Sequence, residues 1–113
     1  MPRFVILEHD WPTLHWDFLL EAGAALRSWR LRSEPAIGTV MLAEAMPDHR
    51  SIYLDYEGPV SGGRGTVKRW DDGTIEWIDD RIDRVEIQLH GHIFCSRAVL
   101  LRVGENWTCH FSR

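Results

Sequence analysis

Turn-forming residues punctuate the whole chain at short intervals. Between them lie runs of five to ten residues rich in Val, Ile, Leu, Trp and Tyr. This pattern is typical of an all-β barrel or sandwich. The turn signals are Trp11-Pro12, Glu21-Ala22-Gly23, Glu34-Pro35, Pro47-Asp48, the glycine cluster Gly58 to Gly65, Asp71-Asp72-Gly73, His90-Gly91 and Gly104-Glu105-Asn106.

We expect strands near residues 3–9, 14–21, 25–32, 51–57, 65–70, 74–79, 84–90, 93–103 and 107–112. One short helix over 39–45 is expected to end before Pro47, because a proline discourages the helix from continuing. Asp71-Asp72-Gly73 is expected to form a hairpin turn, which accounts for both aspartates without a ligand. The sequence therefore predicts an all-β protein, a compact eight- or nine-stranded antiparallel β-barrel with at most one short helix.

The length of 113 residues supports one hydrophobic core, so we expect a single domain over residues 1–113. The formal net charge of −4 argues against a protein that holds nucleic acid by a broad basic surface. Any contact with nucleic acid must then be local. Among the thirteen cationic residues only Lys68 is a lysine, and arginine is the side chain better suited to forked phosphate contacts.

The N-terminal sequence lacks the apolar run of a signal peptide, and no apolar run approaches the roughly 20 residues needed to span a bilayer. We therefore expect a cytoplasmic protein without a membrane association. Cys95 and Cys109 are expected to stay reduced there, buried on late strands as packing residues.

The stretch from His9 to Glu21 carries the clearest chemical pattern. Successive side chains of a strand point to opposite faces, so His15, Asp17 and Glu21 share one face. Leu14, Trp16, Phe18 and Leu20 share the other. A hairpin through 10–13 would return the chain antiparallel and place His9 beside His15. The product is a site of two histidines and one carboxylate, a ligand set that leaves coordination positions open for water and substrate. The alternative is that these are ordinary polar residues of a turn and a solvated strand.

A second polar cluster follows Asp48. On an extended strand, His49, Tyr53, Asp55 and Glu57 would share the face opposite Ile52, Leu54 and Tyr56. If this strand lies near the first cluster, the polar faces join into one shallow site on the outside of the barrel. His49 and Tyr53 could then donate hydrogen bonds to phosphate oxygens, or His49 could protonate a leaving oxygen. A purely structural role for both remains the alternative.

The run F-V-I-L-E-H-D-x-x-x-L-H-W-D-F-x-L-E resembles the opening of the 3′-phosphoesterase domain of bacterial DNA ligase D. Matches continue in order along nearly the whole chain. They are Leu26-x-Ser28-Trp29, Asp48-His49 with Tyr53, Tyr56-Glu57-Gly58, Gly65-Thr66-Val67 with Trp70-Asp71, Leu89-x-Gly91, Leu100 and Trp107.

The resemblance implies a β-barrel that uses Mn²⁺ to trim the 3′ ends of DNA. A 3′-terminal ribonucleotide is removed and the remaining 3′-phosphate is hydrolysed, as in non-homologous end joining. The metal ligands of the family map onto His9, His15 and Asp17, and its active-site histidine and tyrosine onto His49 and Tyr53. Zn²⁺ or another divalent transition metal could fill the same site.

Three basic positions of the family are not basic here: they fall at Leu19, Met41 and Ser33. The N-terminal extension that carries residues for the diesterase step has no counterpart in this sequence. Arg30 and Arg32 on the third strand, Arg50 beside His49 and Arg64 in the glycine-rich loop could supply the missing charge. Their alternative role is that of solvated surface residues.

Three functions remain open at this point. The first is a free-standing, monomeric metal-dependent phosphoesterase that acts on nucleic-acid 3′ ends, DNA in particular, beside repair ligases or polymerases. The second is a metal-containing barrel that binds such ends or a repair partner without cutting. The third is a barrel that retains only the fold.

Overall fold

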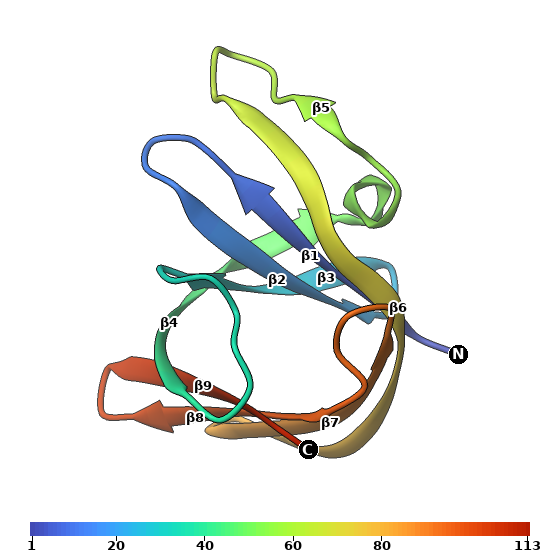
Figure 1. Ribbon diagram of the computed structural model, residues 1–113, viewed down its shortest axis with the longest axis vertical. Coiled ribbons are helices and arrows are strands. Elements are labelled where there is room, and N and C mark those ends of the chain that lie inside the picture. The colour runs from blue at the N-terminus through green and yellow to red at the C-terminus, as the bar shows by residue number, and fades with distance from the viewer.

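The computed structural model covers residues 1–113 and is a closed, eight-stranded antiparallel barrel with one additional short strand (Figure 1). Around the barrel the order is β1-β2-β3-β4-β9-β8-β7-β6, and β6 returns to pair with β1. This confirms the predicted all-β barrel. The elements are β1 Arg3–His9, β2 His15–Ala22, β3 Ala25–Leu31, β4 Val40–Arg50, the 3₁₀ turn η1 Ser51–Leu54, β5 Gly58–Pro59, β6 Thr66–Arg81, β7 Arg84–Gly91, β8 Arg97–Val103 and β9 Asn106–Ser112. No helix is long and apolar enough to cross a membrane.

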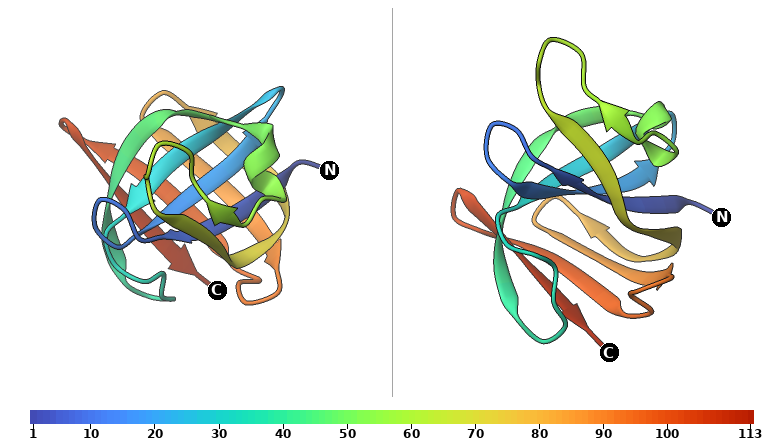
Figure 2. Two further views of the ribbon diagram at one scale, coloured as in Figure 1. Left: turned by 90° about the horizontal axis from the view of Figure 1, so that it is seen from above. Right: turned by 45° about the horizontal axis from the view of Figure 1, so that its top comes forward.

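Two apolar clusters bury both faces of the first strands. Eighteen buried residues fill the barrel interior, among them Phe18, Leu20 and Phe111. A second cluster of six lies on the outer face of β1 to β3 and comprises Val5, Leu7, Leu19, Leu26, Leu54 and Val67. Figure 2 shows η1 and the β5 segment lying over these strands. The uninterrupted apolar run at the start of β1 follows from this double burial.

The helix expected over 39–45 is wrong, because residues 40–45 belong to β4. Their burial alternates with the period of a strand, with Met41 and Ala43 inside and Val40 and Leu42 exposed. β4 pairs with both β3 and β9 and so joins the first strands of the barrel to the last ones. Pro47 lies where the register between β3 and β4 shifts, and such an irregularity tolerates a residue without an N–H group.

The strand expected over 51–57 is also wrong. The chain leaves β4 at Arg50 and turns through η1, so residues 51–57 form a cover over the outer cluster and not a sheet strand. The common face predicted for His49, Tyr53, Asp55 and Glu57 does not exist. Asp55 instead pairs with Arg3 at 2.6 Å, and Glu57 accepts the N–H of Arg69 at 2.9 Å.

The hairpin predicted at Asp71-Asp72-Gly73 is absent, and the expected strands 65–70 and 74–79 are one long strand, β6. Its first part pairs with β1 and its second part with β7, and Gly73 lies where the two pairings overlap. A Cβ on Gly73 would collide with the carbonyl of His90, so glycine serves a close backbone approach there. Its φ is not positive.

The carboxylate of Asp71 holds the connection between β7 and β8. It accepts the backbone N–H groups of His92 at 2.9 Å, Ile93 at 3.1 Å and Phe94 at 2.9 Å, and that of Asp72 at 2.9 Å. The strand expected from residue 93 therefore begins only at Arg97. Cys95 lies in this loop and is exposed, contrary to prediction, whereas Cys109 is buried as predicted.

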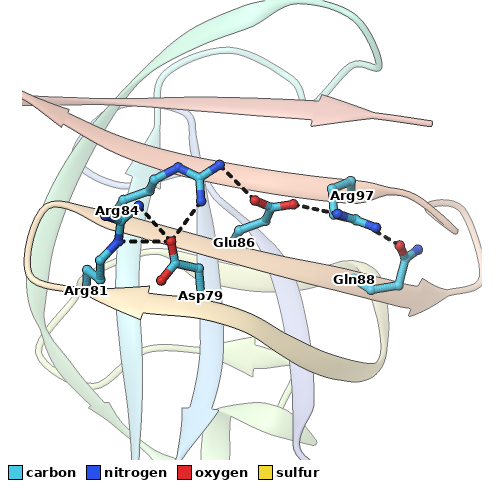
Figure 3. Close-up of polar contacts among 6 residues, drawn as sticks. All are labelled: Asp79, Arg81, Arg84, Glu86, Gln88 and Arg97. Atoms are coloured by element: carbon cyan, nitrogen blue, oxygen red, sulfur yellow. Dashed lines mark hydrogen bonds and ion pairs between the residues drawn. The ribbon is translucent and has the colours of Figure 1, made fainter.

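The outer face of β6 to β8 carries a chain of ion pairs (Figure 3). Arg84 contacts Asp79 at 2.9 Å and Glu86 at 2.7 Å, and Arg97 contacts Glu86 at 2.6 Å. Arg81 joins Asp79 at 2.8 Å. Two carboxylates thus offset most of the charge of three arginines, and opposite charges on neighbouring strands are common on a sheet face.

Candidate metal centre

The hairpin between β1 and β2 places the two histidines side by side, as predicted. His9 and His15 are direct partners in the antiparallel register, and Asp17 lies on the same face of β2 two residues later. One potential ligand atom from each residue lies within 4.8 Å of the others. The structure thus brings His9, His15 and Asp17 together as the alternation in the sequence implies.

The loop that joins these strands is tied to the start of β6. Asp10 Oδ1 accepts the N–H of Thr66 at 2.7 Å. Gly65 has a φ of +73°, and a Cβ there would collide with Asp10 and Trp11. A glycine is required at this position because it permits both the backbone conformation and the close approach. The hydrogen bond from Thr66 to Asp10 and the close approach at Gly65 hold the hairpin loop against the glycine-rich segment.

Each imidazole is oriented by one backbone carbonyl. His9 Nε2 lies 2.8 Å from the carbonyl oxygen of Arg64, and His15 Nδ1 lies 2.8 Å from that of Thr13. A carbonyl oxygen only accepts, so these two ring nitrogens carry the protons. His9 Nδ1 and His15 Nε2 therefore present lone pairs, an arrangement that typically fixes the tautomer of metal-binding histidines.

Both lone pairs face the Asp17 carboxylate. His9 Nδ1 lies 3.3 Å from Oδ2, and His15 Nε2 lies 3.2 Å from Oδ1. His15 Nε2 carries no proton in this tautomer and cannot donate to the carboxylate, so this fully buried nitrogen has no hydrogen-bond partner. An unpaired buried acceptor is costly, and three electron-rich atoms converging on one point repel one another. A cation between them resolves both problems.

The charge state of Asp17 suits a cation ligand. Burial alone would raise its pKa, but hydrogen donation and positive charge at His15, His49 and His9 outweigh that effect, and the pKa of Asp17 is lowered from its ordinary value. Positive charge at this position therefore stabilises the carboxylate, and a cation between neutral imidazoles would supply it. A carboxylate with two neutral imidazoles fits a divalent transition metal, and it leaves further coordination positions unfilled by protein. The residues present therefore fit the metal that the sequence pattern predicts.

A pocket of about 360 Å³ opens beside the triad on the outer face of the barrel. His9 and Asp17 form part of its wall, while His49 and Tyr53 line it from the end of β4 and from η1. The rings of His49 and Tyr53 lie 5.8 Å apart. His49 Nδ1 lies 3.1 Å from the Pro47 carbonyl, which leaves Nε2 free. The two clusters predicted from sequence thus share one site, although Tyr53 reaches it from a 3₁₀ turn.

Three of the four predicted arginines line this pocket: Arg30, Arg50 and Arg64. The guanidinium of Arg50 lies 6.0 Å from the ring of Tyr53. Arg64 Nε donates to the Ser61 carbonyl at 2.7 Å. Arg32 does not line the pocket; it forms an ion pair with Glu44 at 2.7 Å, as the surface alternative anticipated.

The three positions that are basic in the family but not in this chain lie in different places relative to the pocket. Leu19 shares a face with Asp17 but is fully buried in the outer apolar cluster. Met41 lies in the barrel interior, so position 41 in this chain does not face the pocket. Ser33 lies in the exposed loop between β3 and β4.

Sequence reasoning missed several residues of this site. Trp11, Met46 and Asp48 also line the pocket, and the carbonyls of Thr13 and Arg64 orient the histidines. No residue spacing predicts contacts made by backbone carbonyls. The glycine cluster before β6 was the available signal, because a close approach of two backbones needs a residue without a side chain.

The chain matches known proteins over most of its length. The family model for the DNA ligase D 3′-phosphoesterase domain matches residues 7–102. The multifunctional non-homologous end joining protein LigD of Pseudomonas aeruginosa is 33% identical over 96 residues, which cover 80% of this chain and 11% of that protein.

The corresponding DNA repair protein LigD of Mycobacterium tuberculosis is 33% identical over 117 residues, which cover 95% of this chain and 15% of that protein. The LigD protein of Mycolicibacterium smegmatis is 30% identical over 125 residues, 96% of this chain and 16% of its own length. The chain thus spans a small part of the length of each of these relatives. It belongs to the DNA ligase D 3′-phosphoesterase domain family.

Proposed function

We propose that this protein is a divalent-metal-dependent phosphoesterase that processes 3′ ends of nucleic acid in DNA repair. The observation that carries the proposal is the convergence of His9, His15 and Asp17 beside a pocket lined by His49 and Tyr53. The end-joining roles named for the relatives support DNA ends as the substrate. A 3′-phosphate, a 3′-terminal ribonucleotide or both would be removed.

Mn²⁺ is the proposed ion, with Zn²⁺ as the second candidate. A ligand set of two imidazoles and one carboxylate suits divalent transition metals and leaves coordination positions for substrate. Bound there, such an ion supplies Lewis acidity toward a phosphoryl oxygen. The protein holds its ligands ready for this role through the carbonyls of Thr13 and Arg64.

The residues at the pocket wall then act on the phosphate group. Tyr53 can donate its hydroxyl proton to a non-bridging oxygen, where negative charge builds in the transition state. His49 is held by the Pro47 carbonyl so that Nε2 is free to face the substrate. In the protonated state His49 can give a proton to the leaving oxygen while a water oxygen forms the new bond to phosphorus. The leaving oxygen is the 3′ oxygen of the primer for a 3′-phosphate, and the 5′ oxygen of the terminal nucleoside for a 3′-ribonucleotide.

The test uses a 5′-labelled DNA primer that ends in a 3′-phosphate or a single 3′-ribonucleotide, with Mn²⁺ and gel analysis of the products. His15→Ala should abolish turnover because a ligand is lost. The matched control is His90→Ala, since His90 is exposed and pairs with Glu76 at 2.9 Å outside the pocket. Absence of Mn²⁺-dependent cleavage by the wild type, or equal activity of both variants, would refute the proposal.

His49→Gln separates proton donation from metal binding. Because His49 is not among the proposed ligands, this variant should bind Mn²⁺ like the wild type while kcat falls by roughly 10²–10⁴, the usual contribution of a general acid or base. Loss of Mn²⁺ binding in His49→Gln would instead place this residue in the metal centre.

A second candidate function is recognition of 3′ ends, or of a repair ligase or polymerase, without cutting. Burial of Leu19 in the apolar cluster favours it, because no charge from position 19 reaches the pocket. Binding of a 3′-phosphorylated primer together with Mn²⁺, without turnover on DNA or on a matching RNA primer, would support this alternative over the first.

A further inference from the structure

Arg30 is the one arginine of the pocket that has a buried guanidinium nitrogen without a hydrogen-bond partner. The residue lies on β3 and lines the pocket, yet it forms no ion pair. Its Nε atom is buried and makes no hydrogen bond. A buried donor without an acceptor destabilises a folded protein, so an arginine in this position calls for a functional explanation, such as a ligand that accepts its hydrogen bonds.

The neighbouring strands explain why Arg30 is left free. In the register it lies between Asp17 on β2 and Glu44 on β4. Glu44 is already bound to Arg32, at 2.8 Å through Nε and 2.7 Å through a terminal nitrogen. Asp17 is turned toward the two histidines. Neither acid next to Arg30 in the sheet neutralises it.

The other two arginines of the pocket are held differently. Arg64 donates to the carbonyl and the hydroxyl oxygen of Ser61, which lies in its own loop. Arg50 is exposed and lies over the ring of Tyr53. Arg30 differs from both because it lies within a barrel strand directly across from Asp17, whereas Arg50 ends β4 and Arg64 lies in a loop.

We propose that Arg30, on β3, is the principal phosphate-binding residue of this pocket. Arg30 supplies the positive charge that position 19 cannot supply, because Leu19 is apolar and buried. The inference rests on the proposed function. A guanidinium can form a forked pair of N–H bonds to two phosphate oxygens, which supplies orientation as well as charge. The pocket is lined by three arginines and by two carboxylates, those of Asp17 and Asp48. It is therefore locally positive and suited to an anion, although the whole chain has a net charge of −4.

The experiment measures binding of inorganic phosphate to the metal-free protein by isothermal titration calorimetry at low salt. Arg30→Gln removes the charge, and Arg30→Lys keeps it without the fork. Arg102→Gln is the matched control, because Arg102 is an exposed arginine of β8 that lies outside the pocket and whose guanidinium contacts only the carbonyl of Gly104. All variants change net charge by at most one unit.

We expect Arg30→Gln to raise the Kd for phosphate at least tenfold, a change of about 1.4 kcal/mol. The Kd of Arg30→Lys should fall between those of the wild type and Arg30→Gln, while that of Arg102→Gln stays within about twofold of the wild type, as distant charges are screened. Equal weakening in Arg30→Gln and Arg102→Gln, or no weakening in Arg30→Gln, would overturn the proposal.

A Mn²⁺ titration of the same variants gives a readout that a merely structural role would not produce. Because the guanidinium lies across the sheet from Asp17, removal of its positive charge should leave Mn²⁺ affinity unchanged or make it tighter. Loss of Mn²⁺ binding in both Arg30→Gln and Arg30→Lys would overturn the proposal by showing that Arg30 shapes the metal centre.

The same measurements separate this inference from the proposed function. If the wild type binds phosphate through Arg30 but cleaves no primer, the enzyme proposal fails and the anion site stands. If the wild type cleaves primers and Arg30→Gln binds phosphate normally, the enzyme proposal stands and the role proposed for Arg30 fails.

Discussion

The buried carboxylate of Asp71 gives the sharpest quantitative prediction for stability. Asp71→Asn keeps the shape of the side chain and one oxygen acceptor, which can still serve the N–H groups held by Oδ1. At the other position an amide NH₂ replaces Oδ2 and faces the N–H of Phe94, a fully buried bond in the wild type. The substitution therefore removes one charge-assisted hydrogen bond and leaves two donors, the new amide NH₂ and the N–H of Phe94, facing each other without an acceptor.

The magnitude follows from these two losses. A hydrogen bond to a charged group contributes about 1.5–3 kcal/mol, and an unsatisfied buried donor costs about 1–3 kcal/mol, so the free energy of unfolding should fall by roughly 2.5–6 kcal/mol. Domains of this size are commonly stable by about 5–15 kcal/mol, so the variant should still fold. The control Asp72→Asn alters a neighbouring carboxylate whose contact is the exposed His92 at 3.5 Å, and should cost less than about 1 kcal/mol.

The assay is urea denaturation at neutral pH, with free energies taken from midpoints at a common m-value. A loss below about 1 kcal/mol for Asp71→Asn, or equal losses for both variants, would refute the role given to Asp71. Stabilisation by Mn²⁺ should persist in Asp71→Asn, since Asp71 does not line the metal pocket.

The remaining predictions concern the cysteines and the surface ion pairs. A thiol reagent should modify exposed Cys95 in the native protein and Cys109 only on unfolding, because burial raises the pKa of the Cys109 thiol and excludes the reagent; equal native rates would contradict this. Hydrogen bonds from Arg97 and Arg84 hold the pKa of Glu86 in the folded protein below its ordinary value. These bonds therefore stabilise the fold at pH values above the pKa of Glu86 in the unfolded chain, and this stabilisation is lost as the pH falls through the pKa of Glu86 in the folded protein. Arg84→Gln should therefore lower Tm slightly at pH 7, with the difference shrinking in 1 M salt and below about pH 4, and a constant difference would argue against an electrostatic origin.

The parts of the fold that follow from local patterns could be predicted from the sequence. The alternation of residues 14–20 fixes the faces of β2, and the Trp11-Pro12 turn places His9 opposite His15. The metal-centre prediction depended only on these local features. It did not require knowledge of the sheet order.

The errors arose where tertiary pairing overrides local signals. β4 pairs with β9 only over Val40–Ala43, so Pro47 lies at a register shift where the strand pairs on one side alone, and it does not mark the end of a helix. Gly73 resembles a turn residue, yet it is needed for contact with His90 far along the chain. The side chain of Asp71 likewise replaces a missing backbone partner for a loop more than twenty residues away, and no local pattern encodes that.

The central claim is that His9, His15 and Asp17 share one divalent ion, and Mn²⁺ titration followed by pulsed electron paramagnetic resonance tests it most directly. The expected result is one tightly bound Mn²⁺ per chain with two coordinated imidazole nitrogens, reduced to one in His9→Ala and with weaker binding in Asp17→Asn. A protein that binds no Mn²⁺, or a bound ion whose nitrogen couplings are unchanged in His9→Ala, would contradict it.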